Sequence, residues 1–321
     1  MMPQGHARIG DALLLEDPRP EARALWQGRP ALAVVVAWDA ADIDPLLGII
    51  VALAGNGSSH MCGARVVGSA ADGRVAVVIE RPPGIALGRV MDALGVAGGT
   101  FPYDVGCRLA LWLTSMSRWM PRVDDMFLTW DGELRASPIP NRGGNTSAYV
   151  RFLSPAELRD EVYGQVEHQA LAIYRAGIVL YALLAKAPPF PFDRTTSWMQ
   201  VLLSITQPHR VPLLQMRPDL SAAAAGLVDA MVTTSPTPHS LMHIQRELER
   251  SACDDEQCIH FLAGVVRECF PGERATDSEF WEQAALLPTA TTSAWTRLNP
   301  VATFDVWAAL RRLNNNSSRT D

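Results

Sequence analysis

Lysine, a residue that often binds phosphate groups, is nearly absent from this chain. Lys186 is the only lysine among 28 basic residues, and it follows the longest apolar segment of the sequence. The neighbouring carboxylates of Asp124 and Asp125 could bind a cation such as Mg²⁺, which prefers oxygen ligands. A lone aspartate in a loop is more often solvated than bound to a metal, so we expect Asp125 to be a solvated loop residue. The sequence therefore predicts no metal site at this position.

Two histidines and one serine also carry side chains that could take part in catalysis. His168 and His239 could act as acids or bases, but no nucleophile or carboxylate stands at a spacing that fixes it beside them. Ser154 has no such neighbour either, and the Ser154-Pro155 pair is typical of a turn or of the start of a helix. We expect the histidines to be solvated or to cap helices.

The cysteines form an odd and scattered set, which is typical of reduced thiols in a cytosolic core. They are Cys62, Cys107, Cys253, Cys258 and Cys269. The last three, with His260, could be imagined as a zinc site, but their spacing matches none of the usual paired-ligand patterns. We expect thiols in the core or at the surface, with neither a metal nor a cofactor.

The composition is that of a folded chain without a surface suited to nucleic acid. Of the 321 residues, 48% are apolar and 19% are charged, which is enough apolar material for a sizeable core. The net charge is −6 and no basic cluster is present, so binding to a nucleic-acid backbone is not expected.

No segment has the pattern of a membrane span. The longest apolar stretch, residues 173–184, is interrupted by Arg175 and is shorter than the roughly 20 residues that a span requires. The first residues include Asp11, Glu16 and Asp17 and lack the basic-then-apolar order of a secretion signal. We therefore expect a cytoplasmic protein without a membrane partner. The preference for arginine over lysine is associated with bacterial coding sequences of high GC content.

The first 84 residues have the pattern of a small antiparallel sheet. Short apolar runs between turn signals predict strands at residues 9–15, 22–27, 31–38, 64–68 and 75–79. A helix is predicted near residues 45–54, with Asp44 as its N-cap and Pro45 at its first position. Residues 80–84, Glu-Arg-Pro-Pro-Gly, form the predicted linker to the next part.

Residues 85–250 are predicted to be mostly helical. Helices are expected at residues 103–120, 169–186, 219–232 and 240–251, and the second of these is apolar nearly all round, as in a fully buried helix. The exception is a hairpin over residues 126–136, because Trp130-Asp131-Gly132 is a tight-turn signal in which the glycine can adopt positive φ.

Residues 251–321 form a predicted helical extension with a frayed tail. An amphipathic helix is expected at residues 255–270, ended by Pro271-Gly272. Trp281, Trp295 and Trp307 follow it, outside the expected core. We expect the extension to pack these side chains back on the helical part; the alternative is a surface that binds a partner.

Several stretches resemble a bacterial serine/threonine protein kinase domain of the eukaryotic type. They are residues 77–84 (the fifth strand and hinge), 127–135 (the hairpin after the catalytic loop), 152–159 (the segment after the activation loop), 173–190 (the buried central helix) and 217–220 (the lead into the next helix). They occur in the order of that family over roughly residues 8–250, and residues 255–274 are similar to tails of myxobacterial members. The resemblance implies an α+β, two-lobed protein kinase-like fold, with a small antiparallel-sheet N-lobe and a large helical C-lobe.

The positions that bind ATP in the N-lobe of this family are altered here. Residues 16–21 replace the glycine loop with a segment that has prolines and acids and no glycine. The third-strand lysine falls on Val35 or Val36, and no acidic residue between Asp44 and Asp72 could supply its glutamate partner.

The catalytic positions of the C-lobe are altered as well. In the register of the resemblance the catalytic aspartate reads as Met120, the metal-binding asparagine as Asp125, and the Asp-Phe-Gly segment as Pro138-Ile139-Pro140. Three supporting positions read as Ala156, Ala172 and His239. A general base contributes about 10²–10⁴ in rate, and the metal and lysine contacts supply much of the remaining stabilisation of charge.

The resemblance therefore implies a pseudokinase, an inactive signalling protein that serves as a scaffold or allosteric regulator through protein–protein contacts. By family analogy, the expected partner is an active kinase or another signalling protein. Residues expected to line the cleft between the lobes are Val36, Val78, Glu80 and Met120. Two alternatives stay open: a divergent phosphotransferase that binds ATP through Arg19, Arg81 or Arg122, and a sensor of a small ligand in the cleft.

Overall fold

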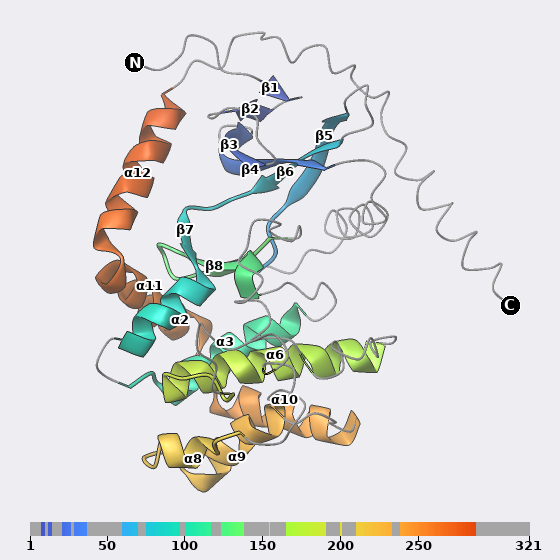
Figure 1. Cartoon of the computed structure of the whole chain (residues 1–321), viewed down its shortest axis with the longest axis vertical. Helices are drawn as coiled ribbons and strands as arrows, with labels where there is room; N and C mark the ends of the chain where they lie inside the picture. The colour runs from blue at the N-terminus through green and yellow to red at the C-terminus, as the bar shows by residue number, and fades with distance from the viewer. Residues whose placement is uncertain are drawn as a thin grey trace, which may run out of the picture. The chain divides into compact units, whose positions relative to one another are not determined.

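The protein has a mixed α+β structure, with small antiparallel sheets and a mostly helical remainder (Figure 1). The computed structural model describes residues 8–9, 12–14, 21–26, 29–36, 60–69, 75–96, 100–116, 123–137, 154, 165–190, 200, 210–232 and 238–286. The chain forms two compact units. Unit 1 comprises residues 1–83, 137–139 and 275–321, and unit 2 comprises residues 84–136 and 140–274. The extension expected from residue 251 is thus divided between the two units.

Unit 1 is built on a six-stranded antiparallel sheet. Its strands are β1 (Arg8–Ile9), β2 (Ala12–Leu14), β3 (Glu21–Trp26), β4 (Arg29–Val36), β5 (Ala64–Ser69) and β6 (Val75–Glu80), in the order β1-β2-β3-β4-β6-β5. The predicted single strand at residues 9–15 is wrong, because β1 and β2 are separate strands that pair with each other. The sequence between them is Gly10-Asp11, a pair typical of tight turns. The other predicted strands are confirmed, and the helix predicted near residues 45–54 lies outside the described residues.

Strand β6 is an interior strand of this sheet, next to the edge strand β5. It pairs with β4 on one side and with β5 on the other, and three consecutive residues of β6, Val77, Val78 and Ile79, are buried. Because successive side chains of a strand point to opposite faces, both faces of β6 are covered. The run of valines in β4 and β6 is typical of strands buried in this way.

Unit 2 begins with a small sheet of three strands. They are β7 (Gly84–Ala86), β8 (Met126–Thr129) and β9 (Leu134–Ala136), in the order β7-β8-β9. Gly84, predicted to end the linker, is already part of β7. A Cβ atom at Gly84 would collide with the carbonyl oxygen of Leu128, so only glycine lets these two backbones approach so closely.

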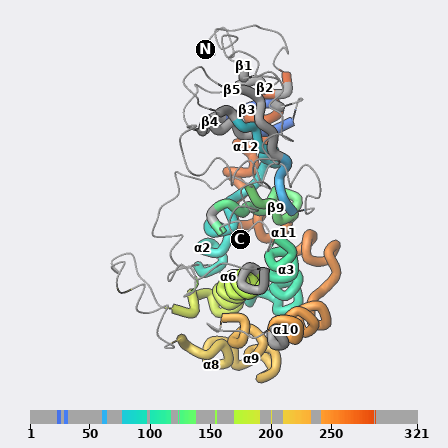
Figure 2. The backbone as a smooth tube through the Cα atoms, turned by 90° about the vertical axis from the view of Figure 1, so that its right-hand side faces the viewer, coloured from blue at the N-terminus to red at the C-terminus, as the bar shows by residue number. Residues whose placement is uncertain are grey.

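The rest of unit 2 is helical. Its helices are α2 (Leu87–Val96), α3 (Tyr103–Ser115), α6 (Gln165–Ala185), α8 (Leu213–Met216), α9 (Ala222–Met231), α10 (Pro238–Ser251) and α11 (Asp255–Cys269). Helix α6 packs against α3 and against α9, and α10 packs mainly against α3 (Figure 2). Its residues 171–181 are all buried, which confirms the predicted fully buried helix. Helix α2 was not predicted.

Helix α12 (Pro271–Ala285) follows α11 directly and extends from unit 2 into unit 1. Pro271-Gly272 was predicted to stop a helix, but it also starts one, because a proline at the first helical position loses no hydrogen bond. Trp281 packs against Leu25 of β3 in unit 1, so the expectation that it packs on the helical part is wrong. Trp295 and Trp307 lie outside the described residues. None of the helices in the described part of the chain is long and apolar enough to cross a membrane.

Candidate functional site

Two of the expected cleft residues, Val36 and Val78, lie on adjacent strands of unit 1 but are not opposite each other. Val36 ends β4 and pairs with Val75, whereas Val78 of β6 pairs with Ala33. The side chain of Val36 is not among those described. That of Val78 is 0% exposed, so a ligand could contact it only if neighbouring side chains moved.

Glu80, the third expected cleft residue, is held by the backbone beside it. Its amide donates to the carbonyl of Gly63 at 2.8 Å, and its carboxylate accepts from the Gly63 amide at 3.2 Å. Arg29 Nη1 lies 4.0 Å from the same carboxylate. Glu80 therefore fastens the end of β6 to the segment before β5.

Asp125 lies at the start of the hairpin strand β8 and is buried. It ends a short 3-10 turn, Val123–Asp125, and its exposed fraction is only 4%. The expectation of a solvated loop aspartate is wrong. All four residues of β8, which follow Asp125 directly, are buried, so the turn lies at the edge of the core. The side chain of Asp124 is not described, and Met120 and Pro138 lie outside the described residues.

The hairpin after Asp125 is confirmed. The Thr129 amide donates to the Glu133 carbonyl at 2.9 Å, and the Gly132 amide donates to the Thr129 carbonyl at 2.9 Å. Gly132 has φ +89°, the positive value that the tight-turn signal predicted. Gly132 also lies close to the backbone of helix α11. A Cβ atom at this position would collide with the carbonyl oxygen of Ile259 and lie 2.6 Å from the amide nitrogen of Ala263.

The single lysine lies at the C-terminal end of helix α6, in unit 2. Lys186 is half-buried and has φ 57°, a left-handed conformation at the position where helices most often end in glycine. The Arg217 guanidinium binds this end of α6 by donating to the carbonyl of Leu184 at 3.1 Å. It also donates two hydrogen bonds of 2.8 Å to the carboxylate of Asp219. Lys186 thus belongs to the end of a helix and not to any strand of the sheet in unit 1.

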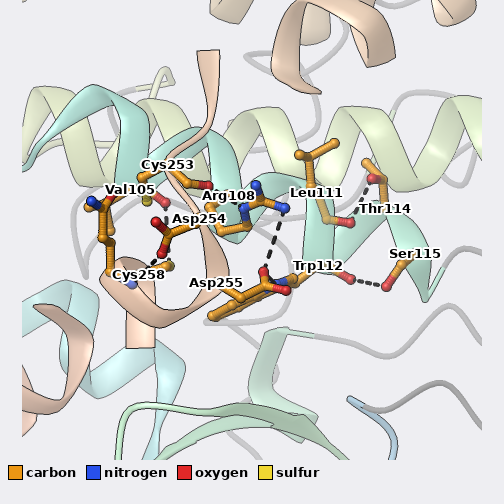
Figure 3. Close-up of polar contacts among 11 residues, drawn as sticks. Val105, Arg108, Leu111, Trp112, Thr114, Ser115, Cys253, Asp254, Asp255 and Cys258 are labelled. Atoms are coloured by element: carbon orange, nitrogen blue, oxygen red, sulfur yellow. Dashed lines mark hydrogen bonds and ion pairs between the residues drawn. The ribbon is translucent and has the colours of Figure 1, made fainter. Parts of the chain in front are cut away.

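A polar junction between α3 and α11 was not identified from the sequence (Figure 3). Arg108 Nε donates to the carbonyl of Cys253 at 2.6 Å, and its Nη1 lies 3.5 Å from Asp255 Oδ1. The same oxygen accepts from the indole N–H of Trp112 at 2.9 Å. Asp254 caps α11 by accepting from the Gln257 amide at 2.7 Å. The Asp-x-x-Gln pattern of this cap could have been read from the sequence.

The cysteines beside this junction are buried thiols. All five cysteines of the chain are free. Burial raises the pKa of Cys107 to about 11, and it also raises the pKa of Cys253 and of Cys258. A thiol with a raised pKa stays protonated near neutral pH, whereas nucleophiles and metal ligands are thiolates. Among the residues that the structure describes, no group of histidine, cysteine, aspartate or glutamate side chains has the arrangement of a metal site.

No family model matches the chain, and no curated protein is significantly similar to it. The assignment of the site residues therefore depends on their geometry and on the sequence pattern.

Proposed function

We propose that the protein is a catalytically inactive, kinase-like protein that acts as a scaffold or allosteric regulator through protein–protein contacts. The observation that carries this proposal is the position of the only lysine. Lys186 ends helix α6 in unit 2, so β4, the strand that would correspond to the lysine-bearing strand of a kinase, has no lysine to offer to ATP phosphates.

The order of strands in unit 1 supports the kinase-like part of the proposal. In a kinase N-lobe the fifth strand lies between the third and the fourth. If the split first strand β1/β2 is counted as one, then β6 is the fifth strand, and it lies between β4 and β5. In unit 2, the hairpin β8–β9 precedes the buried helix α6, which is also the order expected for the kinase C-lobe.

The chemistry of the aligned positions supports the inactive part. The backbone of Val36 lies at the end of β4, and a valine side chain has neither a charge nor a hydrogen-bond donor for a phosphate. In the sequence, Met120 replaces the catalytic base and Pro138 replaces the metal-binding aspartate. Asp125 keeps a carboxylate, but a kinase needs several such groups to act together in stabilising the transferring phosphoryl group.

An assay of phosphoryl transfer tests the proposal directly. The purified chain, with labelled ATP and either Mg²⁺ or Mn²⁺, is expected to modify neither itself nor a generic protein substrate above the level of a protein-free control. An active serine/threonine kinase in the same buffer provides the positive control. Transfer that is abolished by Asp125→Asn, in a variant that still folds, would overturn the proposal in favour of a divergent phosphotransferase.

A further inference from the structure

Two cysteines lie together at the start of helix α11. Asp254 is the N-cap of this helix, so Cys253 precedes the cap and Cys258 is the fourth residue after it. Side chains at these two positions often pack against each other at the beginning of a helix, and they are usually apolar. In this chain both are thiols, and the side chains of Cys253 and Cys258 are hydrogen-bonded to each other.

Both cysteines are also held against the first turn of helix α3 (Figure 3). The Cys253 amide donates to the carbonyl of Asp104 at 3.3 Å, and the Cys258 thiol donates to the carbonyl of Val105, with its sulfur 3.8 Å from the oxygen. Arg108 Nε, one turn further along α3, donates to the Cys253 carbonyl at 2.6 Å. Neighbouring carbonyls of α3 therefore hold the two thiols side by side.

The two thiols differ in their access to solvent. Cys258 is 0% exposed, whereas Cys253 is 8% exposed and lies in the short segment between α10 and α11. A small oxidant such as hydrogen peroxide therefore reaches Cys253 before Cys258. Burial raises the pKa of both thiols, so the nucleophilic thiolate is the minor form near neutral pH and the reaction is slow. The pair is thus suited to respond to sustained rather than brief oxidation.

We propose that Cys253 and Cys258 form a redox-sensitive clasp at the start of α11, a dithiol that hydrogen peroxide converts to a disulfide. The Cys253 sulfur attacks one peroxide oxygen and the O–O bond breaks, which gives a sulfenic acid at Cys253 and one water. The Cys258 sulfur then attacks the sulfenic sulfur, so that an S–S bond replaces the S–O bond and a second water leaves. Two electrons pass from the sulfur atoms to the peroxide, and each thiol proton leaves in one of the two waters. The inference goes beyond the proposed function and does not depend on the kinase interpretation.

Peptide mapping of the full chain tests the disulfide. The native protein is treated with hydrogen peroxide, free thiols are blocked with N-ethylmaleimide in denaturant, and a tryptic digest is analysed by mass spectrometry without a reductant. Trypsin releases residues 251–267 as one peptide, which contains Cys253 and Cys258 and no other cysteine. This peptide is expected to lack two hydrogen atoms and to carry no blocking group, and dithiothreitol should reverse the change. An unlinked pair at peroxide levels that oxidise Cys269, or a disulfide of either cysteine to Cys107, would overturn the proposal.

Hydrogen exchange tests whether the disulfide acts as a clasp. A covalent link across residues 253–258 restricts local opening, so the amides of residues 256–262 are expected to exchange at least about 10-fold more slowly in the oxidised wild type than in the reduced one, while those of α9 are unchanged.

Alanine variants show whether this response needs the two thiols. Cys258→Ala keeps an apolar side chain in the core but cannot form the disulfide, so peroxide should not slow exchange in this variant, and Cys253→Ala repeats the test at the more exposed position. Cys269→Ala is the matched control and should respond as the wild type does. Slowing that persists in Cys258→Ala or Cys253→Ala, or no slowing in the oxidised wild type, would refute the clasp.

Discussion

The replacement of Gly132 by alanine is the most direct test of how the hairpin and helix α11 fit together. Alanine at φ +89° is strained, which costs about 1–2 kcal/mol for a residue with a Cβ atom. The new methyl group also meets the backbone of α11 at Ile259 and Ala263, which cannot rotate away as a flexible side chain would. Overpacking of this kind costs about 1–3 kcal/mol.

Together these effects predict a loss of about 2–5 kcal/mol in the free energy of unfolding, a large part of the 5–15 kcal/mol typical of a domain. Urea denaturation followed by tryptophan fluorescence measures it. Gly132→Asn separates the two causes, because asparagine tolerates positive φ better but keeps the Cβ atom, so it should be destabilising by about 1 kcal/mol less than alanine.

Gly226→Ala in α9 is the matched control. No described atom lies within 4 Å of the position that its Cβ would take, and alanine favours a helix over glycine by about 0.8–1.0 kcal/mol. The control is therefore expected to raise stability. If Gly132→Ala costs less than about 1 kcal/mol, or behaves like Gly226→Ala, the close packing of the hairpin on α11 is wrong.

Three further predictions concern charge, thiols and nucleotide. Arg89 donates two hydrogen bonds to the Glu273 carboxylate, at 2.5 and 2.6 Å, and lowers the pKa of that carboxyl below its usual 4.5. The pair therefore stabilises the folded protein above about pH 4.5, and this stabilisation is lost as the pH falls through the lowered pKa. Glu273→Gln should thus lower the free energy of unfolding at pH 7 by well under about 1 kcal/mol, because the pair is exposed, and the difference from the wild type should shrink as the pH falls through the lowered pKa. A difference in Tm that stays constant as the pH falls would contradict this. At pH 8 iodoacetamide should alkylate only Cys269 in the native protein, because the other cysteines are buried, and mass spectrometry that finds Cys107 or Cys258 modified without denaturant would contradict their burial. ATP with Mg²⁺ should not raise the Tm, whereas a ligand at 100 times its Kd would add about 2.7 kcal/mol and shift the transition by several degrees.

The features that the sequence predicted correctly depend on local chemistry. Gly132 in a Trp-Asp-Gly turn is the residue that the hairpin requires, and the valines of β4 and β6 favour strands. The buried length of α6 follows in the same way from apolar residues on all sides.

The features that were predicted wrongly depend on contacts between distant parts of the chain. The burial of Asp125 is determined by the packing of β8, which a sequence pattern does not contain. The contact between Trp281 and Leu25 joins residues more than 250 positions apart. Pro271 is compatible both with the end of one helix and with the start of another, and the packing of the second helix decided between them.

The location of Lys186 makes the chain convenient for mapping its neighbours. A reagent that reacts with side-chain amines has one target in the whole sequence, and that target is at the end of α6. A cross-linker between two lysine side chains therefore cannot join two positions of the same molecule. Any lysine–lysine cross-link that contains Lys186 must connect this helix end to a different molecule, so it reports association without an internal background.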